Sequence, residues 1–158
     1  MSTPRASLQS ELESNRATFL KILDAITDVD LHRPSENPEW SVREILHHTV
    51  LSLEVLPRGV WVAQRNSPLL NVPQWLYDPL NILITRTGAL GQTRASLRRR
   101  YEAAHVKALA CLSSIPEGDW KKTAPYFYLK PTIEELFRRQ AGHLAEHTTQ
   151  LQQQFLSK

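Results

Sequence analysis

Residues 40–48 read WSVREILHH, and this stretch predicts how a helix in the first half of the chain begins. Ser41, followed three residues later by Glu44, is the pattern of a capping box, in which each side chain pairs with a backbone N–H of the first turn. The apolar residues that come next recur at helical spacing. We therefore expect a helix from Ser41 toward Val62, with a kink or an interruption at Pro57.

Three other segments also show helical spacing of their apolar residues. We expect these helices at about 7–26, 87–112 and 131–155. The connection at about 67–81 is rich in proline and aromatic residues, and a connection of this length often crosses over a bundle or lines a site. These patterns predict one all-α domain over 1–158, a four-helix bundle with a long crossover between its second and third helices.

Composition and charge exclude several classes of function. The chain has 158 residues, which suit one domain, and its formal net charge of +3 does not require a nucleic-acid partner. Cys111 is the only cysteine, so no internal disulfide is possible and a reducing compartment fits. The N-terminal residues form no apolar signal segment, and no apolar run approaches the length of a membrane span. We expect a cytoplasmic protein without nucleic-acid or membrane partners.

Two histidines in the last expected helix, His143 and His147, lie four residues apart in the sequence HLAEH. Residues at this spacing are one turn apart on the same helix face, so their imidazoles can bind one metal ion. Both lie at a margin of the apolar stripe of this helix, toward the interior of the bundle. Three imidazoles with an open position make a catalytic type of metal site, and imidazole suits Zn and Ni.

A third imidazole is available from the histidine doublet at the end of the opening stretch. His48 lies on the side of its helix nearer the apolar stripe, whereas His47 shares a side with Arg43, Glu54 and Arg58. We expect that charged side to be solvated. The helical geometry therefore favours His48 over His47 as the third inward imidazole.

Two carboxylates are candidates for groups that support the metal ligands, and no catalytic residue can be named. Glu44 precedes His48 by one turn, so it either accepts the free ring N–H of His48 or only completes the capping box. Glu146 lies in the H-x-x-E-H pattern of inverted zinc peptidases. We expect no peptidase, because Glu146 lies on the exposed flank and the 11 residues after His147 contain no Asp or Glu. Glu146 is either an outer-shell group or a solvated carboxylate.

The stretch 40–48 resembles the second-helix motif of the DinB-like proteins (the DinB/YfiT group), in which a histidine falls eight residues after a tryptophan. That position is His48 here. His143, His147 and then Gln150 resemble the last-helix pattern of the same family, and the helix order, the long middle connection and the total length also fit. The resemblance implies a four-helix bundle of up-down-down-up topology, with one divalent metal ion held by His48, His143 and His147.

The resemblance also implies a metal-dependent enzyme that acts on a small molecule. Better-known relatives are transferases and isomerases that use low-molecular-weight thiols, so a thiol cofactor is expected beside the metal, and hydrolase chemistry stays open. The alternative is a non-catalytic helical bundle that binds metal or a small ligand. We expect a homodimer, because family members often form one and because large apolar residues cluster around the crossover. These residues are Val60, Trp61, Leu69, Leu70, Trp75, Leu76 and Leu80.

Overall fold

The computed structural model describes residues 4–35, 37–67, 73–123 and 129–156. Within these ranges the chain forms five α-helices, two short 3-10 helices and no strand, so the expectation of an all-α fold is confirmed. The α-helices are α1 (Arg5–Ala25), α2 (Val42–Arg65), α3 (Gln74–Ala89), α4 (Arg94–Ser114) and α5 (Ile133–Leu156), and the 3-10 helices are η1 (Asp30–His32) and η2 (Glu117–Asp119).

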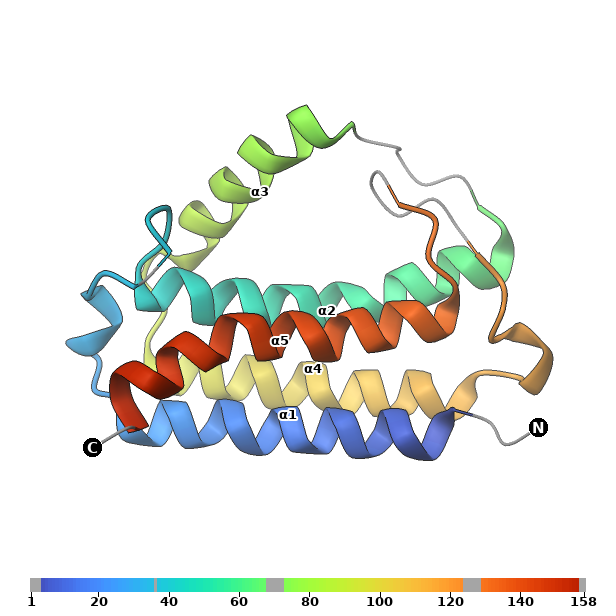
Figure 1. Cartoon of the computed structure of the whole chain (residues 1–158), viewed down its shortest axis with the longest axis horizontal. Helices are drawn as coiled ribbons and strands as arrows, with labels where there is room; N and C mark the ends of the chain where they lie inside the picture. The colour runs from blue at the N-terminus through green and yellow to red at the C-terminus, as the bar shows by residue number, and fades with distance from the viewer. Residues whose placement is uncertain (1–3, 36, 68–72, 124–128, 157–158) are drawn as a thin grey trace.

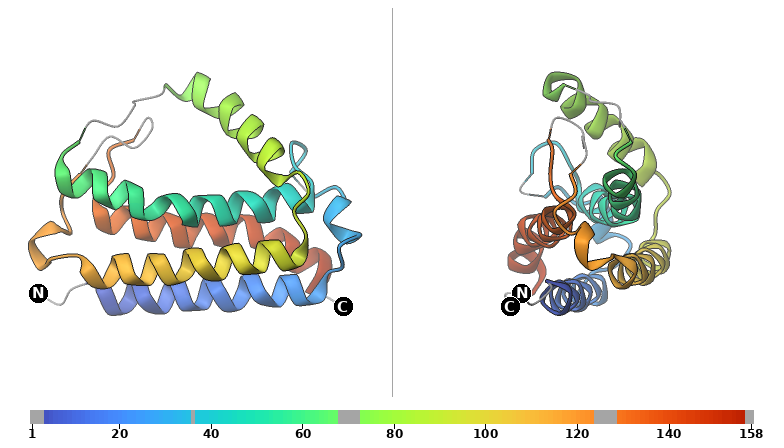
Figure 2. Two further views of the ribbon diagram at one scale, coloured as in Figure 1. Left: turned by 180° about the vertical axis from the view of Figure 1, so that it is seen from behind. Right: turned by 90° about the vertical axis from the view of Figure 1, so that its right-hand side faces the viewer.

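Four of the helices, α1, α2, α4 and α5, lie side by side along the long axis of the molecule (Figure 1). Both α1 and α2 pack against α4 and α5. Along this axis α1 and α5 run in one direction, and α2 and α4 run in the other. The fifth helix, α3, leans away from the other four and approaches them at its C-terminal end, where it packs against α2 (Figure 2).

The capping box predicted at the start of α2 is present. The backbone N–H of Ser41 donates to Glu44 Oε2 at 2.6 Å, and the N–H of Glu44 donates to Ser41 Oγ at 3.4 Å. The helix then runs unbroken through Pro57 to Arg65, so the expected interruption does not occur. Leu56, the residue before Pro57, is buried, so the helix packs on the core at this point.

The long connection after α2 contains a further helix, which was not expected from the sequence. α3 occupies Gln74–Ala89 with Pro79 inside it, and α4 begins separately after its own cap at Thr93. The single helix expected at 87–112 is therefore the end of α3 followed by α4. Gly91, at φ +70°, makes the turn between them, a conformation that glycine adopts without steric cost.

The apolar core lies between the four helices α1, α2, α4 and α5. Phe19 of α1 stacks on Tyr101 of α4 with ring centroids 4.0 Å apart, and both side chains are buried. Aromatic stacking of this kind adds to the stabilisation that comes from burial of apolar area alone. Among the described residues, no helix has both the length and the apolar character needed to cross a bilayer.

Candidate metal centre

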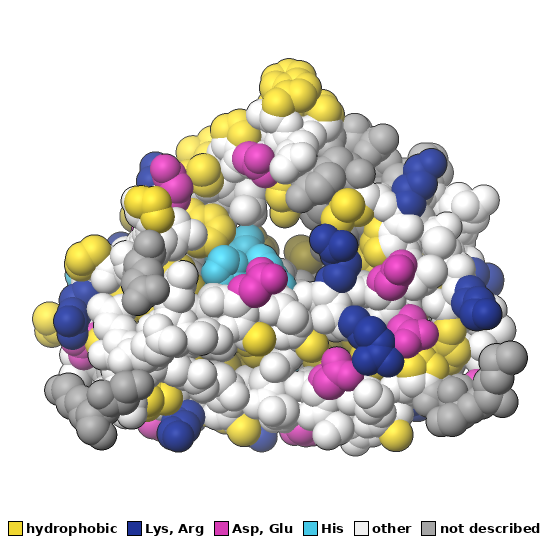
Figure 3. Space-filling model, viewed as in Figure 1, with side chains coloured by type: hydrophobic (Ala, Val, Ile, Leu, Met, Phe, Trp, Pro, Cys, Tyr) yellow, Lys and Arg dark blue, Asp and Glu magenta, His cyan; other side chains and the backbone are white. Residues whose placement is uncertain are grey.

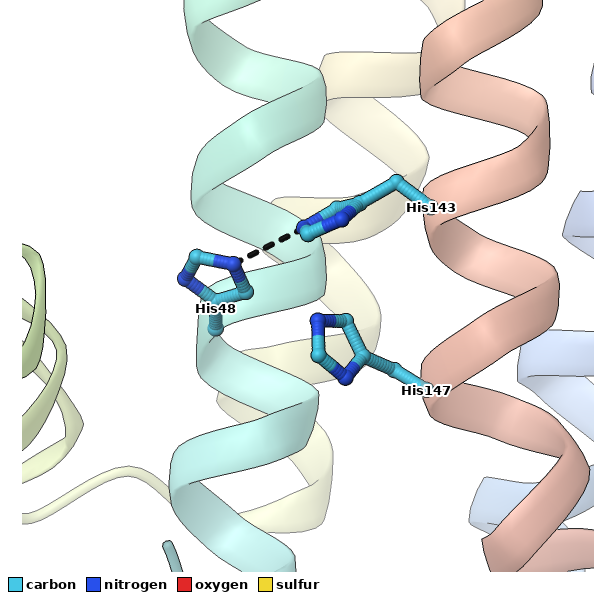
Figure 4. A group of neighbouring side chains, drawn as sticks. All are labelled: His48, His143 and His147. Atoms are coloured by element: carbon cyan, nitrogen blue, oxygen red, sulfur yellow. Dashed lines mark hydrogen bonds between the residues drawn. The ribbon is translucent and has the colours of Figure 1, made fainter. Parts of the chain in front are cut away.

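The side chains of His48, His143 and His147 converge between α2 and α5 (Figure 4). The Nε2 atoms of His48 and His143 are 2.8 Å apart. The ring centroid of His147 lies 5.2 Å from that of His48 and 4.5 Å from that of His143. Each ring offers one nitrogen, and the three nitrogens lie within 4.8 Å of one another. The structure therefore brings together the three histidines that the sequence singles out.

Local structure explains how two helices place three imidazoles at one point. His143 and His147 are adjacent on one face of α5 because they are one helical turn apart. The capping box fixes where α2 begins, and therefore which of its faces carries His48. Trp40, just before the cap, is buried against two of the rings, with its centroid 4.6 Å from that of His48 and 5.6 Å from that of His147.

All three imidazoles are held in the neutral form at neutral pH. Burial, followed by the effect of the neighbouring rings of His143 and His147, lowers the pKa of His48 to about 3. Burial and His143 lower the pKa of His147 to about 4, against a smaller opposing effect of Glu146. The pKa of His143 is lowered by burial and by the charge of Arg139. Neutral imidazoles have the free lone pair that a metal ion requires.

The donor set fits a divalent transition metal ion. Zn–N bonds of about 2.0–2.1 Å place two imidazole nitrogens roughly 3–4 Å apart, and the three ring nitrogens lie within 4.8 Å of one another. Three protein ligands leave a position for a further ligand, as in catalytic sites. His143 and His147 are half-buried. Histidine side chains reach the surface at the edge of a hollow between α3 and the other helices (Figure 3).

The partner of the second ring nitrogen of His48 is Thr85 on α3, not Glu44. Thr85 Oγ1 lies 3.2 Å from His48 Nδ1, and Thr85 is fully buried. The Glu44 carboxylate accepts from the backbone and the hydroxyl of Ser41, so it serves the capping box. Sequence reasoning missed Thr85 because it lies between the expected connection at about 67–81 and the helix expected from about 87, so no helical face was assigned to it.

His47 is buried, which corrects the expectation that its side of α2 is solvated. Its side chain is only 3% exposed, and Arg100 of α4 donates from Nη1 to its Nδ1 at 2.9 Å. Arg100 also forms a two-bond ion pair with Glu54, so α4 packs over His47. Glu54 and Arg58, on the same side of α2, stay exposed, as expected. On the other side of the ring, Gly88 of α3 approaches so closely that an added Cβ would lie 2.5 Å from His47 Nε2.

Glu146 is exposed on the outer flank of α5, as expected from its position on the helix. It is the neighbour of His147 in sequence, and adjacent residues on a helix are about 100° apart, so the two side chains leave α5 on different sides. No hydrogen bond joins it to the three histidines among the described residues. This arrangement favours the interpretation of Glu146 as a solvated carboxylate.

The helices and the site together define a class: an all-α protein with a three-histidine cluster between two antiparallel helices. The family model of the DinB superfamily matches residues 11–151. The chain therefore belongs to the DinB superfamily. No curated protein sequence matches it significantly.

Solved structures with a similar fold include the mycothiol-dependent maleylpyruvate isomerase, with a TM-score of 0.74 and 13% sequence identity. A histidine-to-alanine mutant of that isomerase gives a TM-score of 0.75 at 12% identity. Each similarity covers 96% of this chain and 63% of the isomerase chain. At this identity the likeness concerns the fold, and the chain spans less than two thirds of the isomerase's length.

Proposed function

We propose that this chain is a metal-dependent enzyme in which His48, His143 and His147 hold one divalent ion, Zn or Ni. The observation that carries the proposal is the convergence of three neutral imidazole rings from two helices on one point. A buried polar cluster of this kind is costly unless its groups are paired. Among the described residues, the cluster has one internal hydrogen bond, between His48 and His143.

We further propose that the chain uses a low-molecular-weight thiol in a transferase or isomerase reaction on a small molecule. The membership of the DinB superfamily and the fold shared with a mycothiol-dependent isomerase support this proposal. We also propose that the chain is a single four-helix bundle domain over 1–158 of up-down-down-up topology, a proposal supported by the directions of α1 and α5, which run opposite to α2 and α4. The hollow at the edge of the histidine cluster offers access from solvent (Figure 3).

The side chains of the site would act in binding and orientation. His48, His143 and His147 would hold the ion, which would supply Lewis acidity that lowers the pKa of a bound thiol and so makes it nucleophilic at neutral pH. Trp40 packs on two of the rings and limits their rotation. Its indole also excludes water from one side of the cluster, because Trp40 is only 8% exposed. The reacting groups would enter from the half-buried side of His143 and His147.

Metal analysis of the purified protein tests the first part of the proposal. The metal-free chain is dialysed against zinc or nickel, desalted and analysed by mass spectrometry for metal content. We expect about one equivalent in the wild type, as for other sites with three protein ligands, and almost none in the His143→Ala/His147→Ala double variant. His32→Ala is the matched control, because His32 is exposed on η1. A double variant that keeps its full metal content would refute the ligand assignment.

Thiol binding tests the second part. A cobalt-substituted sample is titrated with a panel of low-molecular-weight thiols, and sulfur-to-cobalt charge-transfer absorption reports a thiolate on the ion. We expect this absorption in the wild type and its absence in the double variant. A protein that binds the metal but neither thiol nor substrate analogues would instead be the non-catalytic bundle, the second candidate function.

A further inference from the structure

Thr85 is a buried polar residue on a helix that otherwise stands mostly away from the bundle. Of the α3 residues, only Thr85 and Ala89 are buried, and both belong to the end of α3 that approaches α2. Thr85 is 0% exposed, and the partner of its hydroxyl is Nδ1 of His48 at 3.2 Å. A hydroxyl in such a place contacts the one nitrogen of His48 that does not face the histidine cluster.

We propose that Thr85 is a positioning residue for His48, and that it sets the tautomer of the His48 ring. Thr85 Oγ1 accepts the Nδ1–H of His48, which leaves the lone pair of Nε2 free and directed at the centre of the cluster. The tautomer itself does not depend on the proposed metal site. Its expected consequence, tighter metal binding at His48 Nε2, rests on that proposed function.

The two distances at His48 fit either of two proton arrangements: Nδ1–H donates to Thr85, or the Thr85 hydroxyl donates to Nδ1. Only the first leaves the Nε2 lone pair free for a metal ion, and it is the arrangement that we propose. A neutral imidazole carries one N–H and one lone pair, and the hydrogen bond made by one nitrogen fixes which nitrogen binds metal. With its proton on Nδ1, His48 accepts at Nε2 from the Nε2–H of His143, and these two atoms are 2.8 Å apart. The same Nε2 lone pair would then bind the ion.

No other described group competes for the Nδ1 proton. The Glu44 carboxylate, one turn away, is held by the N–H and the hydroxyl of Ser41 at 2.6 and 2.7 Å. Trp40 covers the ring at 4.6 Å with an aromatic surface that is no substitute for an oxygen acceptor. The glycine at position 88 allows α3 to approach α2 closely enough for Thr85 to reach His48.

The experiment compares Thr85→Val, which has the same shape without the hydroxyl, with Thr85→Ser, which keeps the hydroxyl. Thr87→Val is the matched control, because the exposed Thr87 hydroxyl bonds only to carbonyl groups of its own helix. The first readout is long-range ¹H–¹⁵N NMR of the His48 ring in the metal-free full-length chain. We expect the Nδ1–H tautomer in the wild type, Thr85→Ser and Thr87→Val, and a mixture of tautomers in Thr85→Val.

The second readout is zinc affinity, measured by competition with a chromophoric chelator. We expect Thr85→Val to bind zinc about 10–100-fold more weakly than the wild type, while Thr85→Ser and Thr87→Val remain close to it. The Nε2–H tautomer in the metal-free wild type, or wild-type zinc affinity in a folded Thr85→Val, would overturn the inference. If Thr85→Val does not fold, the His48 tautomers in the wild type and in Thr85→Ser test the inference instead. A wild type that binds neither zinc nor nickel refutes the proposed function, and the NMR still tests Thr85.

Discussion

Arg100 Nη1 donates a hydrogen bond of 2.9 Å to Nδ1 of His47, while the adjacent His48 turns to the histidine cluster. The two members of the doublet are neighbours in sequence but contact different helices. His47 is enclosed by α3 and α4, and His48 faces α5 and Thr85 of α3. His47 thus packs between helices, whereas His48 is available to bind a metal ion.

The doublet predicts opposite outcomes for two alanine variants. His48→Ala should lose its stoichiometric zinc, because it removes one of the three imidazoles. His47→Ala should keep the zinc but lose on the order of 1–3 kcal/mol of stability, because it removes a buried ring and a hydrogen bond to Arg100. Metal analysis and urea unfolding measure both effects. Loss of zinc from His47→Ala with the fold intact would contradict the assignment.

Gly88→Ala should destabilise the protein although alanine is the better helix former. Its new Cβ would lie 2.5 Å from Nε2 of the buried His47, so the ring or α3 must move, at a cost of about 1–3 kcal/mol. Gly142→Ala on α5 is the control, since its Cβ meets open space and should stabilise by about 0.5–1 kcal/mol. The variants are compared by thermal or urea unfolding.

A double variant tests whether His47 is the cause of that clash. Combining Gly88→Ala with His47→Ala should restore most of the stability lost through Gly88→Ala, because the obstructing ring is gone. Simple additivity of the two destabilisations would mean that some other contact of α3 is responsible.

The metal-free protein should lose stability as the pH falls from 7 to 5. Burial, followed by the charge of Arg100, lowers the pKa of His47 from 6.5 to about 4. Below pH 6.5 the His47 imidazole is therefore protonated in the unfolded chain but stays neutral in the folded chain. Lowering the pH thus favours unfolding until the pH reaches about 4. At pH 5 this amounts to roughly 2 kcal/mol for His47 alone.

Urea unfolding at several pH values measures this effect. His47→Gln should show a shallower loss of stability between pH 7 and pH 5 than the wild type does, because its side chain does not titrate. An unchanged slope in the variant would show that His47 is not the source.

Glu44→Ala should reduce stability without weakening the metal site. It removes the carboxylate that accepts from the N–H and the hydroxyl of Ser41, and loss of such a cap costs about 1 kcal/mol. Zinc affinity should stay close to that of the wild type, because the ring N–H of His48 is bonded to Thr85. Glu146→Ala is the surface control for both measurements. A zinc affinity lowered as strongly as in Thr85→Val would instead make Glu44 a partner of the site.

We propose that the chain forms a homodimer through the exposed apolar side of α3. Of the residues expected in this patch, Val60 is buried, Leu69 and Leu70 lie outside the described residues, and Trp61 is partly exposed on α2. The α3 side chains Trp75, Leu76, Leu80, Leu83 and Ile84 are 41–75% exposed. An apolar surface of this kind is usually covered in a stable protein.

Light scattering at micromolar concentration measures the assembly. The wild type should have the mass of a dimer, and Leu83→Glu should shift it toward the monomer. Val106→Glu is the control, because Val106 is 64% exposed on α4, away from this patch. A wild-type mass equal to that of one chain at every concentration would exclude the dimer.

Local rules were enough for much of the fold and for two of the candidate ligands. The Ser41–Glu44 capping box fixed the start of α2, because it depends on residues three apart. The spacing of His143 and His147 placed both on one face of α5 for the same reason. Family resemblance and the apolar side of α2 together selected His48. Apart from the resemblance, each of these inferences uses only the geometry of a single helix.

Tertiary structure decided what covers each helix face. The charged side of α2 was expected to be solvated, and Glu54 and Arg58 are exposed, but Arg100 of α4 packs over His47 and buries it. The helix that carries Thr85 was not predicted, because prolines mark its first part as a connection. The contact of Thr85 with His48 joins residues 37 positions apart in the sequence. Helical periodicity shows which residues share a face, because that geometry is local. Which element packs on that face depends on the whole chain, because it follows from the best simultaneous burial of every apolar surface.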